Sequence, residues 1–445
     1  MKTERVYQKD VYMKECAARI ISCEPTDGGI LLEFDKTIFF PTGGGQSCDT
    51  GFIYILGDEN SKAKNTADTK SAAFEIVSVF EDGKRVLHRA IPLYDNCPAA
   101  EAADVSAQSA SLSLADIGMR VLQKIDWERR FDNMQRHCGE HILSGMFYSK
   151  FGGVNRGFHM GEAYMTIDIS LEKNPAYNTL TWDMAKEAEL AANEVIWNDR
   201  QITTHRFKTR EEASAMPLRK ALTIDEDISI VCIGSIENAS DCVACCGTHP
   251  SSAGQVGLIK IWKIEPNKGM FRIYCEAGRR AYLDYEKKHD IITAIENKYS
   301  AGTDDLEEKM AIADEKAKAV RMELAAMRKI VIGSRTADIE NERQQDGHSS
   351  PLIVRRYNDI KPDDLLHIGK PFIGSIGKLL VLADTNSNTV MLFSDGKRFD
   401  CGRLIKENAP IYNGKGGGRA DNARAIFPNA EYLETFIDLL GKHLR

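Results

Sequence analysis

Two pairs of potential metal ligands, more than 100 residues apart, most constrain how this 445-residue chain can fold. His137 and His141 are four residues apart, and so are Cys245 and His249. On a helix, side chains at this spacing lie on one face, so both histidines can reach one ion. Zinc prefers a tetrahedral set of imidazole and thiolate ligands. The sequence therefore predicts that the fold joins both segments around one Zn²⁺ per chain.

The identity and number of the zinc ligands stay open on spacing alone. Cys246 or Cys242 can replace Cys245 as the thiolate, because all three lie in one short segment. Four protein ligands would also give a closed, structural site, whereas catalysis needs a position for water. We expect His249 to be the loosely held ligand, or to act from a position next to the metal.

Glu140 stands beside the second histidine in the segment His-Cys-Gly-Glu-His. In metalloproteases with the pattern HExxH, the glutamate instead follows the first histidine. On a helix Glu140 points about 100° away from His141. We therefore expect Glu140 to be a surface residue and not a general base, which argues against a protease.

The composition limits the compartment and the partners. The first residues contain no apolar signal segment, and no apolar run approaches the length of about 18 residues that suggests a membrane span. An odd count of 11 cysteines then favours thiols over a disulfide framework and a cytoplasmic location. The net charge of −7 counts against a nucleic-acid partner without excluding one. Two local basic clusters are Lys260, Lys263, Lys268, Arg272, Arg279 and Arg280, and Lys415, Arg419 and Arg424.

The first quarter of the chain is predicted to be a small β-barrel over residues 1–95. A polar stretch, 58–70, is expected to be an exposed loop, and the alanine-rich range 96–124 is expected to be a linker. The segments with strand character are 30–35, 73–80 and 85–88.

The middle of the chain, 125–290, is predicted to be an α+β domain that carries the zinc site. One helix is expected over 125–150, with Asp126 as its N-cap and Gly152 at its end. A second helix is expected over 181–197. The expected strands are 228–233, 257–264 and 271–275.

The last part of the chain is predicted to hold a helical connector, 291–340, and an α/β domain, 341–445. The connector contains a charged helix bounded by Gly302 and Gly333, which is typical of a spacer or a coiled-coil arm. The expected elements of the last domain are strands at 378–383 and 390–393 and a helix at 429–443. The predicted fold class of the whole chain is α+β.

Several segments resemble the editing domain of alanyl-tRNA synthetase and its free-standing relatives. Residues 39–51 read FFPTGGGQSCDTG, similar to the family's F-Y-P-x-G-G-G-Q-x-x-D-x-G, and residues 245–249 read CCGTH, similar to C-G-G-T-H. Residues 416–424, GGGRADNAR, resemble the DHH-associated domain that ends these synthetases. Further similar segments are 158–162, 254–257, 267–272 and 278–281.

This resemblance implies a hydrolase that removes the wrong amino acid from tRNA(Ala), chiefly serine and also glycine, with zinc at the chemistry. Because the glycine-rich segment begins some forty residues after Met1, we expect editing in trans without tRNA charging. A homodimer through the connector helix or the C-terminal domain is also expected. The metal and catalytic residues are His137, His141, Cys245 and His249, and the expected substrate contacts are Gly43, Gly44, Gly45, Gln46, Asn155, His159 and Arg272.

Two other functions fit the same residues. A metal-dependent hydrolase of small esters or amides would use the same ligands, but it would not need the C-terminal domain. A non-catalytic tRNA-binding module would contain zinc as a structural ion. Hydrolysis of aminoacyl-tRNA distinguishes editing from both alternatives.

Overall fold

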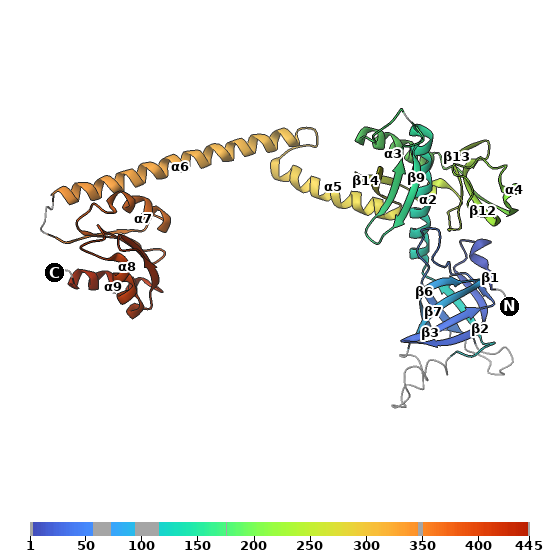
Figure 1. The fold of residues 1–445 in the computed structure, drawn as a ribbon, viewed down its shortest axis with the longest axis horizontal. Helices are drawn as coiled ribbons and strands as arrows, with labels where there is room; N and C mark the ends of the chain where they lie inside the picture. The colour runs from blue at the N-terminus through green and yellow to red at the C-terminus, as the bar shows by residue number, and fades with distance from the viewer. Residues whose placement is uncertain (1–2, 57–72, 94–114, 175, 346–349, 444–445) are drawn as a thin grey trace. The chain divides into compact units, whose positions relative to one another are not determined.

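The computed structural model describes residues 3–56, 73–93, 115–174, 176–345 and 350–443 (Figure 1). The chain divides into two compact units, Met1–Thr293 and Ala294–Arg445. The predicted loop 58–70 and most of the predicted linker 96–124 lie outside the described residues. Mixed helices and strands confirm the α+β class.

The predicted barrel at the start of the chain is confirmed, and it is closed by six strands in the order β2-β3-β7-β6-β5-β8. Alternate residues such as Ile30, Leu32 and Phe34 are fully buried inside it. The linker prediction is wrong at its end, because β8 pairs with both β2 and β5 and completes the barrel. Closure leaves no unpaired strand edge. The strands are β2 (Glu15–Thr26), β3 (Gly29–Phe34), β5 (Gly51–Ile55), β6 (Phe74–Asp82), β7 (Arg85–Pro92) and β8 (Arg120–Ile125).

The central helix, α2 (Trp127–Phe151), begins and ends as the sequence predicts. The Asp126 carboxylate accepts a hydrogen bond from the Arg129 amide at 3.1 Å, and Gly152 takes the left-handed conformation with φ 66°. The middle of α2 is buried on every side. A Cβ at Gly139 would lie 2.4 Å from the Ala277 side chain, so only glycine permits this close packing.

Two sheets and a helix surround α2, and Figure 1 shows α2 beside β9 and α3. One sheet has the order β14-β15-β10-β9, and the other has the order β11-β12-β13. Helix α3 (Trp182–Trp197) matches the predicted range 181–197, and Thr181 is its N-cap. Helix α5 (Arg279–Tyr299) follows β15 and begins before the predicted helical connector, 291–340. The strands are β9 (Val154–Met160), β10 (Met165–Ser170), β11 (Ile202–Thr209), β12 (Glu226–Ser235), β13 (Asn238–Ala244), β14 (Ile259–Asn267) and β15 (Met270–Ala277).

Cys232 and Cys242 lie directly opposite each other on β12 and β13. Their sulfur atoms are bonded as a disulfide. The expectation that the cysteines stay as thiols is therefore wrong for this pair, because strand pairing brings two cysteines ten residues apart face to face. Cys242 is thereby removed from the possible zinc ligands.

The second unit contains the long helix α6 (Leu306–Gln345) and a sheet of order β16-β17-β18-β20-β19. Alternate residues of β17 face two different cores, with Val381 in one and Leu382 in the other. Helix α6 continues past Gly333, so its predicted end there is wrong. The other elements are β16 (Leu352–Tyr357), α7 (Pro362–Gly369), β17 (Leu379–Asp384), β18 (Thr389–Phe393), α8 (Cys401–Asn408), β19 (Lys415–Gly418), β20 (Asn422–Ile426) and α9 (Ala430–His443).

The helices that the structure describes include no candidate membrane span. None of them combines the length and the apolar composition needed to cross a bilayer.

Candidate metal centre

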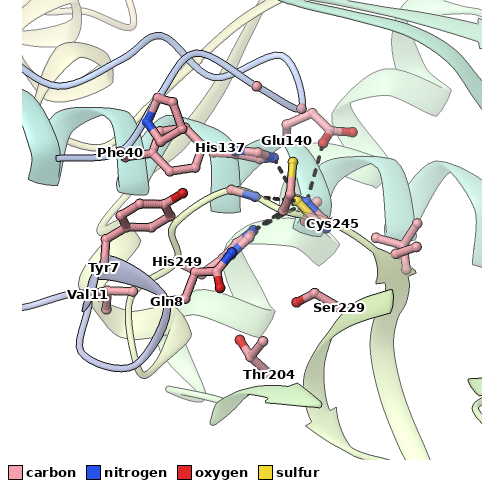
Figure 2. Close-up of a pocket in the computed structure, with 18 of the residues that line it drawn as sticks. Tyr7, Gln8, Val11, Phe40, His137, Glu140, Thr204, Ser229, Cys245 and His249 are labelled. Atoms are coloured by element: carbon pink, nitrogen blue, oxygen red, sulfur yellow. Dashed lines mark hydrogen bonds and ion pairs between the residues drawn. The ribbon is translucent and has the colours of Figure 1, made fainter. Parts of the chain in front are cut away.

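The structure brings the two predicted ligand pairs together. The ligand atoms of His137, His141, Cys245 and His249 all lie within 4.8 Å of one another (Figure 2). The Cys245 sulfur is 3.3 Å from Nε2 of His137 and 3.8 Å from Nε2 of His249. Nε2 of His249 lies 3.4 Å from Nε2 of His141. Three imidazoles and one thiol thus point at one centre.

These separations fit a tetrahedral metal ion. With bonds of about 2.0–2.3 Å from zinc to nitrogen and sulfur, the ligand atoms of a tetrahedron lie roughly 3.3–3.7 Å apart. The separations of 3.3, 3.4 and 3.8 Å between ligand atoms fall at or next to this range. His249 lies as close to the cluster as the other three residues, so the geometry does not single it out as the loose ligand.

Two elements supply the ligands. His137 and His141 lie one turn apart in the middle of α2, while Cys245 and His249 lie in the loop after β13. The Cys245 amide donates a hydrogen bond to the Ser229 carbonyl at 2.9 Å, which fixes the start of this loop. A Cβ at Gly247 would lie 2.3 Å from the His137 ring, so glycine is required where the loop passes the helix.

Gln46, which follows the three glycines, orients His137. Its Oε1 lies 2.9 Å from Nδ1 of His137 and accepts a hydrogen bond from the Thr248 amide at 3.0 Å. Its Nε2 donates to the Thr248 hydroxyl at 2.8 Å. Because Oε1 only accepts, Nδ1 must carry the proton and Nε2 is left free to bind a metal.

Asp241 orients His141 in the same way. Its Oδ2 lies 3.2 Å from Nδ1 of His141, and its Oδ1 accepts a hydrogen bond from Arg219 at 2.6 Å. Burial would raise the pKa of Asp241, but Arg219 and His141 outweigh it and hold the pKa below its usual value. Asp241 therefore remains a carboxylate behind the ligand.

The neighbouring cysteines differ in how readily they ionise. Burial opposes ionisation of Cys245, but the three surrounding histidines, foremost His137, hold its pKa well below the ordinary value. Loss of solvent around its sulfur, which packs against the glycine segment, raises the pKa of Cys246. Only the Cys245 sulfur belongs to the cluster. The geometry therefore favours Cys245 over Cys242 and Cys246 as the thiolate ligand.

Glu140 is buried, with 5% of its surface exposed, which corrects the expectation of a surface residue. Its Oε1 accepts hydrogen bonds from the Ser144 hydroxyl at 2.6 Å and from the Asn155 amide at 2.5 Å. The prediction of a surface position is wrong because α2 is enclosed on all sides. A residue rotated away from His141 therefore still faces the protein interior.

The cluster opens into a cavity of about 1160 Å³. Glu140, Gly43, Gly44 and Asn155 lie in its wall together with the four ligands. Figure 2 shows Tyr7, Phe40 and other residues of the N-terminal segment along one side. The basic side chains that line it are Arg5, Lys9, Arg156, Arg206, Arg219 and Lys220.

The expected substrate residues fall in different places. Gly43, Gly44 and Asn155 line the cavity, whereas Gln46 is engaged with the ligands. A Cβ at Gly45 would lie 2.6 Å from Phe158, so this glycine permits close packing, and its φ of +81° suits a turn.

His159 and Arg272 lie outside the described lining of the cavity. His159 is exposed on β9. Arg272 makes two hydrogen bonds of 2.8 Å to Asp168. The basic cluster around Arg272 is largely paired with carboxylates in the same way, as Arg280 is with Asp132 at 2.9 Å.

Sequence reasoning missed Asp241, Arg219, Ser144 and Thr248. A signal existed for Asp241, because histidine ligands commonly donate their second nitrogen to a carboxylate, and Asp241 precedes the Cys245 segment by four residues. The other three residues carry no comparable pattern.

Comparisons with known proteins agree with this site. Residues 228–274, which contain Cys245 and His249, match the family described as threonyl and alanyl tRNA synthetase second additional domain. The chain is 32% identical to the alanyl-tRNA editing protein AlaX-L of Pyrococcus horikoshii over 62% of this chain and 59% of that protein.

Alanine–tRNA ligases are similar over nearly the whole chain. The ligase of Pyrococcus abyssi is 24% identical over 98% of this chain and 44% of the ligase. The ligase of Ignicoccus hospitalis is 26% identical over 99% of this chain and 42% of the ligase. The chain thus spans about half the length of these relatives.

Among solved structures, the C-Ala domain from Aquifex aeolicus alanyl-tRNA synthetase matches 21% of this chain and 89% of that domain. It shares 17% identity with a TM-score of 0.19, which is too low to establish a common fold. The sequence matches, by contrast, cover both ligand segments. The chain is thus similar to an alanyl-tRNA editing protein and to the corresponding part of the alanine–tRNA ligases, and it contains the matched domain at residues 228–274.

Proposed function

We propose that this protein is a zinc-dependent hydrolase that removes the amino acid from mischarged tRNA(Ala). The observation that carries the proposal is the convergence of His137, His141, Cys245 and His249 at the wall of a large cavity. An alanyl-tRNA editing protein is among the relatives, which supports an aminoacyl ester as the substrate.

The chain's own residues prepare the site for this reaction. Gln46 and Asp241 fix the tautomers of two histidines, so that Nε2 of each faces the metal position. Bound zinc would polarise the ester carbonyl and lower the pKa of a bound water to about 7. Arg206 and Lys220 of the cavity wall, which join none of the ion pairs among the described residues, would supply positive charge for the phosphates at the end of the tRNA.

Serine and glycine are the proposed amino acids. A synthetase pocket that fits alanine discriminates only about a hundredfold against an added hydroxyl, and it cannot exclude a smaller side chain by size. Removal of these two products is therefore the task that an alanyl-tRNA editing site serves.

A non-catalytic tRNA-binding module is the second candidate, and one observation favours it. All four ligand atoms converge, and four protein ligands are typical of structural zinc. Catalysis would require one ligand to move away or the coordination to expand.

The test is deacylation of Ser-tRNA(Ala), Gly-tRNA(Ala) and Ala-tRNA(Ala) by the zinc-loaded protein. We expect loss of serine and glycine with alanine retained, and loss of all activity in Cys245→Ala. The adjacent Cys246→Ala is the matched control and should keep both zinc and activity. If all three esters survive while zinc and tRNA still bind, the binding module is the correct function.

A second copy of the chain is the proposed partner of α6. Val320, Leu324, Met327 and Val331 follow each other at spacings of four, three and four residues, and all are exposed by 40% or more. This is the spacing of a coiled-coil seam. Sedimentation should show a dimer that Leu324→Glu dissociates and the off-seam change Lys318→Glu does not, and a monomeric wild type would contradict the proposal.

A further inference from the structure

Oε2 of Glu140 accepts no hydrogen bond from the part of the chain that the structure describes. Both donors that reach this carboxylate, from Ser144 and Asn155, bond to Oε1. Within the described residues, Oε2 makes its one ion-pair contact with Nε2 of His141, at 4.0 Å. Figure 2 shows this side chain beside the ligand cluster. One carboxylate oxygen is thus fixed, and the other borders the metal position in the cavity wall.

Among the described ion pairs, the charge of Glu140 is met only by His141, whose Nε2 is one of the atoms that would hold the metal. A buried carboxylate is costly unless it is paired with a cation as well as hydrogen-bonded. Arg219, which also lines the cavity, is already paired with Asp241. Lys220 lines the cavity, but among the described ion pairs none joins it to Glu140. A ligand that carries a positive charge would compensate this carboxylate better than a neutral hydroxyl.

The substrate class carries such a charge at the right place. In an aminoacyl ester the α-nitrogen is about 2.5 Å from the carbonyl carbon, given the bond lengths and angle at Cα. An ester carbonyl that lies against the ligand cluster therefore brings its α-nitrogen close to a group bordering the same cluster. The ionised α-amine has three donors and can bond Oε2 directly.

We propose that Glu140 binds the α-ammonium group of the aminoacyl ester and so restricts the enzyme to esters with a free amine. The inference rests on the proposed deacylase function. Esters whose amine is blocked, such as those of a growing peptide on tRNA, lose this contact and place an uncharged amide against a buried carboxylate. Ser144 and Asn155 act as positioning residues, because they hold Oε1 and thereby aim Oε2.

The test compares the seryl ester of tRNA(Ala) with the ester in which a hydroxyl replaces the α-amine. Each enzymatic rate is divided by the uncatalysed rate of that ester, because the ammonium group itself activates the carbonyl. For the wild type we expect kcat/KM to favour the amine by about ten- to a hundredfold, the range of a charge-assisted hydrogen bond. Glu140→Gln, which keeps size and polarity, should abolish this preference by slowing the seryl ester alone.

Glu162→Gln is the matched control, because Glu162 is exposed and outside the described lining of the cavity. It should retain the preference. Equal losses on both esters in Glu140→Gln would overturn the inference in favour of a proton-transfer or structural role. A loss that follows the serine hydroxyl, seen as a changed ratio of seryl to glycyl ester, would also overturn it.

A binding measurement separates this inference from the proposed function. Calorimetry would compare 3′-seryl-amido adenosine, which cannot be hydrolysed as an ester, with its N-acetyl form. We expect the wild type to bind the free amine at least tenfold more tightly and Glu140→Gln to bind both alike. Tighter binding of the free amine without any deacylation would refute the proposed deacylase function and keep the inference about Glu140. Deacylation without any preference for the free amine would refute the inference and keep the function.

Discussion

Gln46 connects three features that lie far apart in the sequence. One amide side chain holds the His137 ring and both the amide and the hydroxyl of Thr248. It is 1% exposed, so water cannot replace these bonds. Its position makes the glycine-rich segment part of the metal centre.

Gln46→Ala should therefore weaken metal binding without removing a ligand. The change leaves Nδ1 of His137 and the Thr248 hydroxyl without partners, and loss of such a contact typically costs 10–100-fold in affinity. Competition with a chromogenic chelator measures it. Gln46→Glu keeps an acceptor for His137, so its metal affinity should fall less. Gln201 is exposed, and Gln201→Ala should leave the metal affinity unchanged. Unchanged affinity in Gln46→Ala would contradict this role.

At this scale the sequence predicted which four side chains converge but not what holds them in place. The spacing within each pair follows from one helical turn or one short loop, so local reasoning finds it. Gln46 and Asp241 reach their histidines across 91 and 100 residues, and such contacts depend on the finished fold. Glu140 was misjudged because the helix position of a residue does not tell how many sides of the helix are covered.

His88 in the barrel gives a pH dependence that does not involve the metal. Its Nδ1 donates to the Leu32 carbonyl, and its Nε2 accepts from the Thr37 hydroxyl at 2.8 Å. Burial lowers the pKa of His88 from 6.5 to about 4. The unfolded chain therefore binds a proton below pH 6.5 that the folded chain does not bind until about pH 4.

The free energy of unfolding should fall as the pH drops from about 6.5 towards 4 and should gain nothing from His88 above that range. The contribution between pH 7.5 and pH 5 is about 2 kcal/mol. Urea unfolding of the wild type and His88→Gln at both pH values isolates it, because the other histidines are common to both proteins. Parallel pH profiles would contradict the assignment.

Two glycines in helices illustrate how packing decides the effect of the same substitution. Gly139 in α2 faces the Ala277 side chain, whereas nothing lies within 4 Å of a Cβ at Gly333 in α6. Gly139→Ala should lower the stability of its unit by about 1–3 kcal/mol through overpacking. Gly333→Ala should raise the stability of its unit by about 1 kcal/mol through helix propensity. Thermal unfolding of both variants tests this, and shifts of the same sign would refute it.

The same glycines explain where element boundaries were predicted well and where they were not. Gly152 ends α2 because it adopts φ 66°, a conformation that favours glycine. Gly333 was expected to end α6, but a single glycine costs only about 1 kcal/mol inside a helix, and the residues on both sides continue it. Strand β8 was taken for linker because pairing with β2 and β5, on either side, is not a local property.

The division into two units predicts how the whole chain responds to metal removal. All four ligands lie in Met1–Thr293, and Ala294–Arg445 has its own cores. Calorimetry should resolve two thermal unfolding transitions, one for each unit. A strong chelator should lower the midpoint temperature of the first unit's transition only, because binding stabilises only the unit that holds the ion. In the Cys245→Ala variant, the first unit should unfold at this lower midpoint temperature even without chelator. A shift of both transitions would mean that the units unfold together.

The contact between Gln46 and Thr248 spans 202 residues, and this sets the order of events during synthesis. A chain that leaves the ribosome exposes the glycine-rich segment first and the His137 pair next, and domains fold as they emerge. Until Cys245 and His249 have left the exit tunnel, an ion at the helix would have only two of the four candidate ligands. Completion of the candidate metal centre is therefore tied to synthesis of nearly all of the first unit, and we expect a nascent chain that stops before Cys245 to bind zinc more weakly than the finished chain.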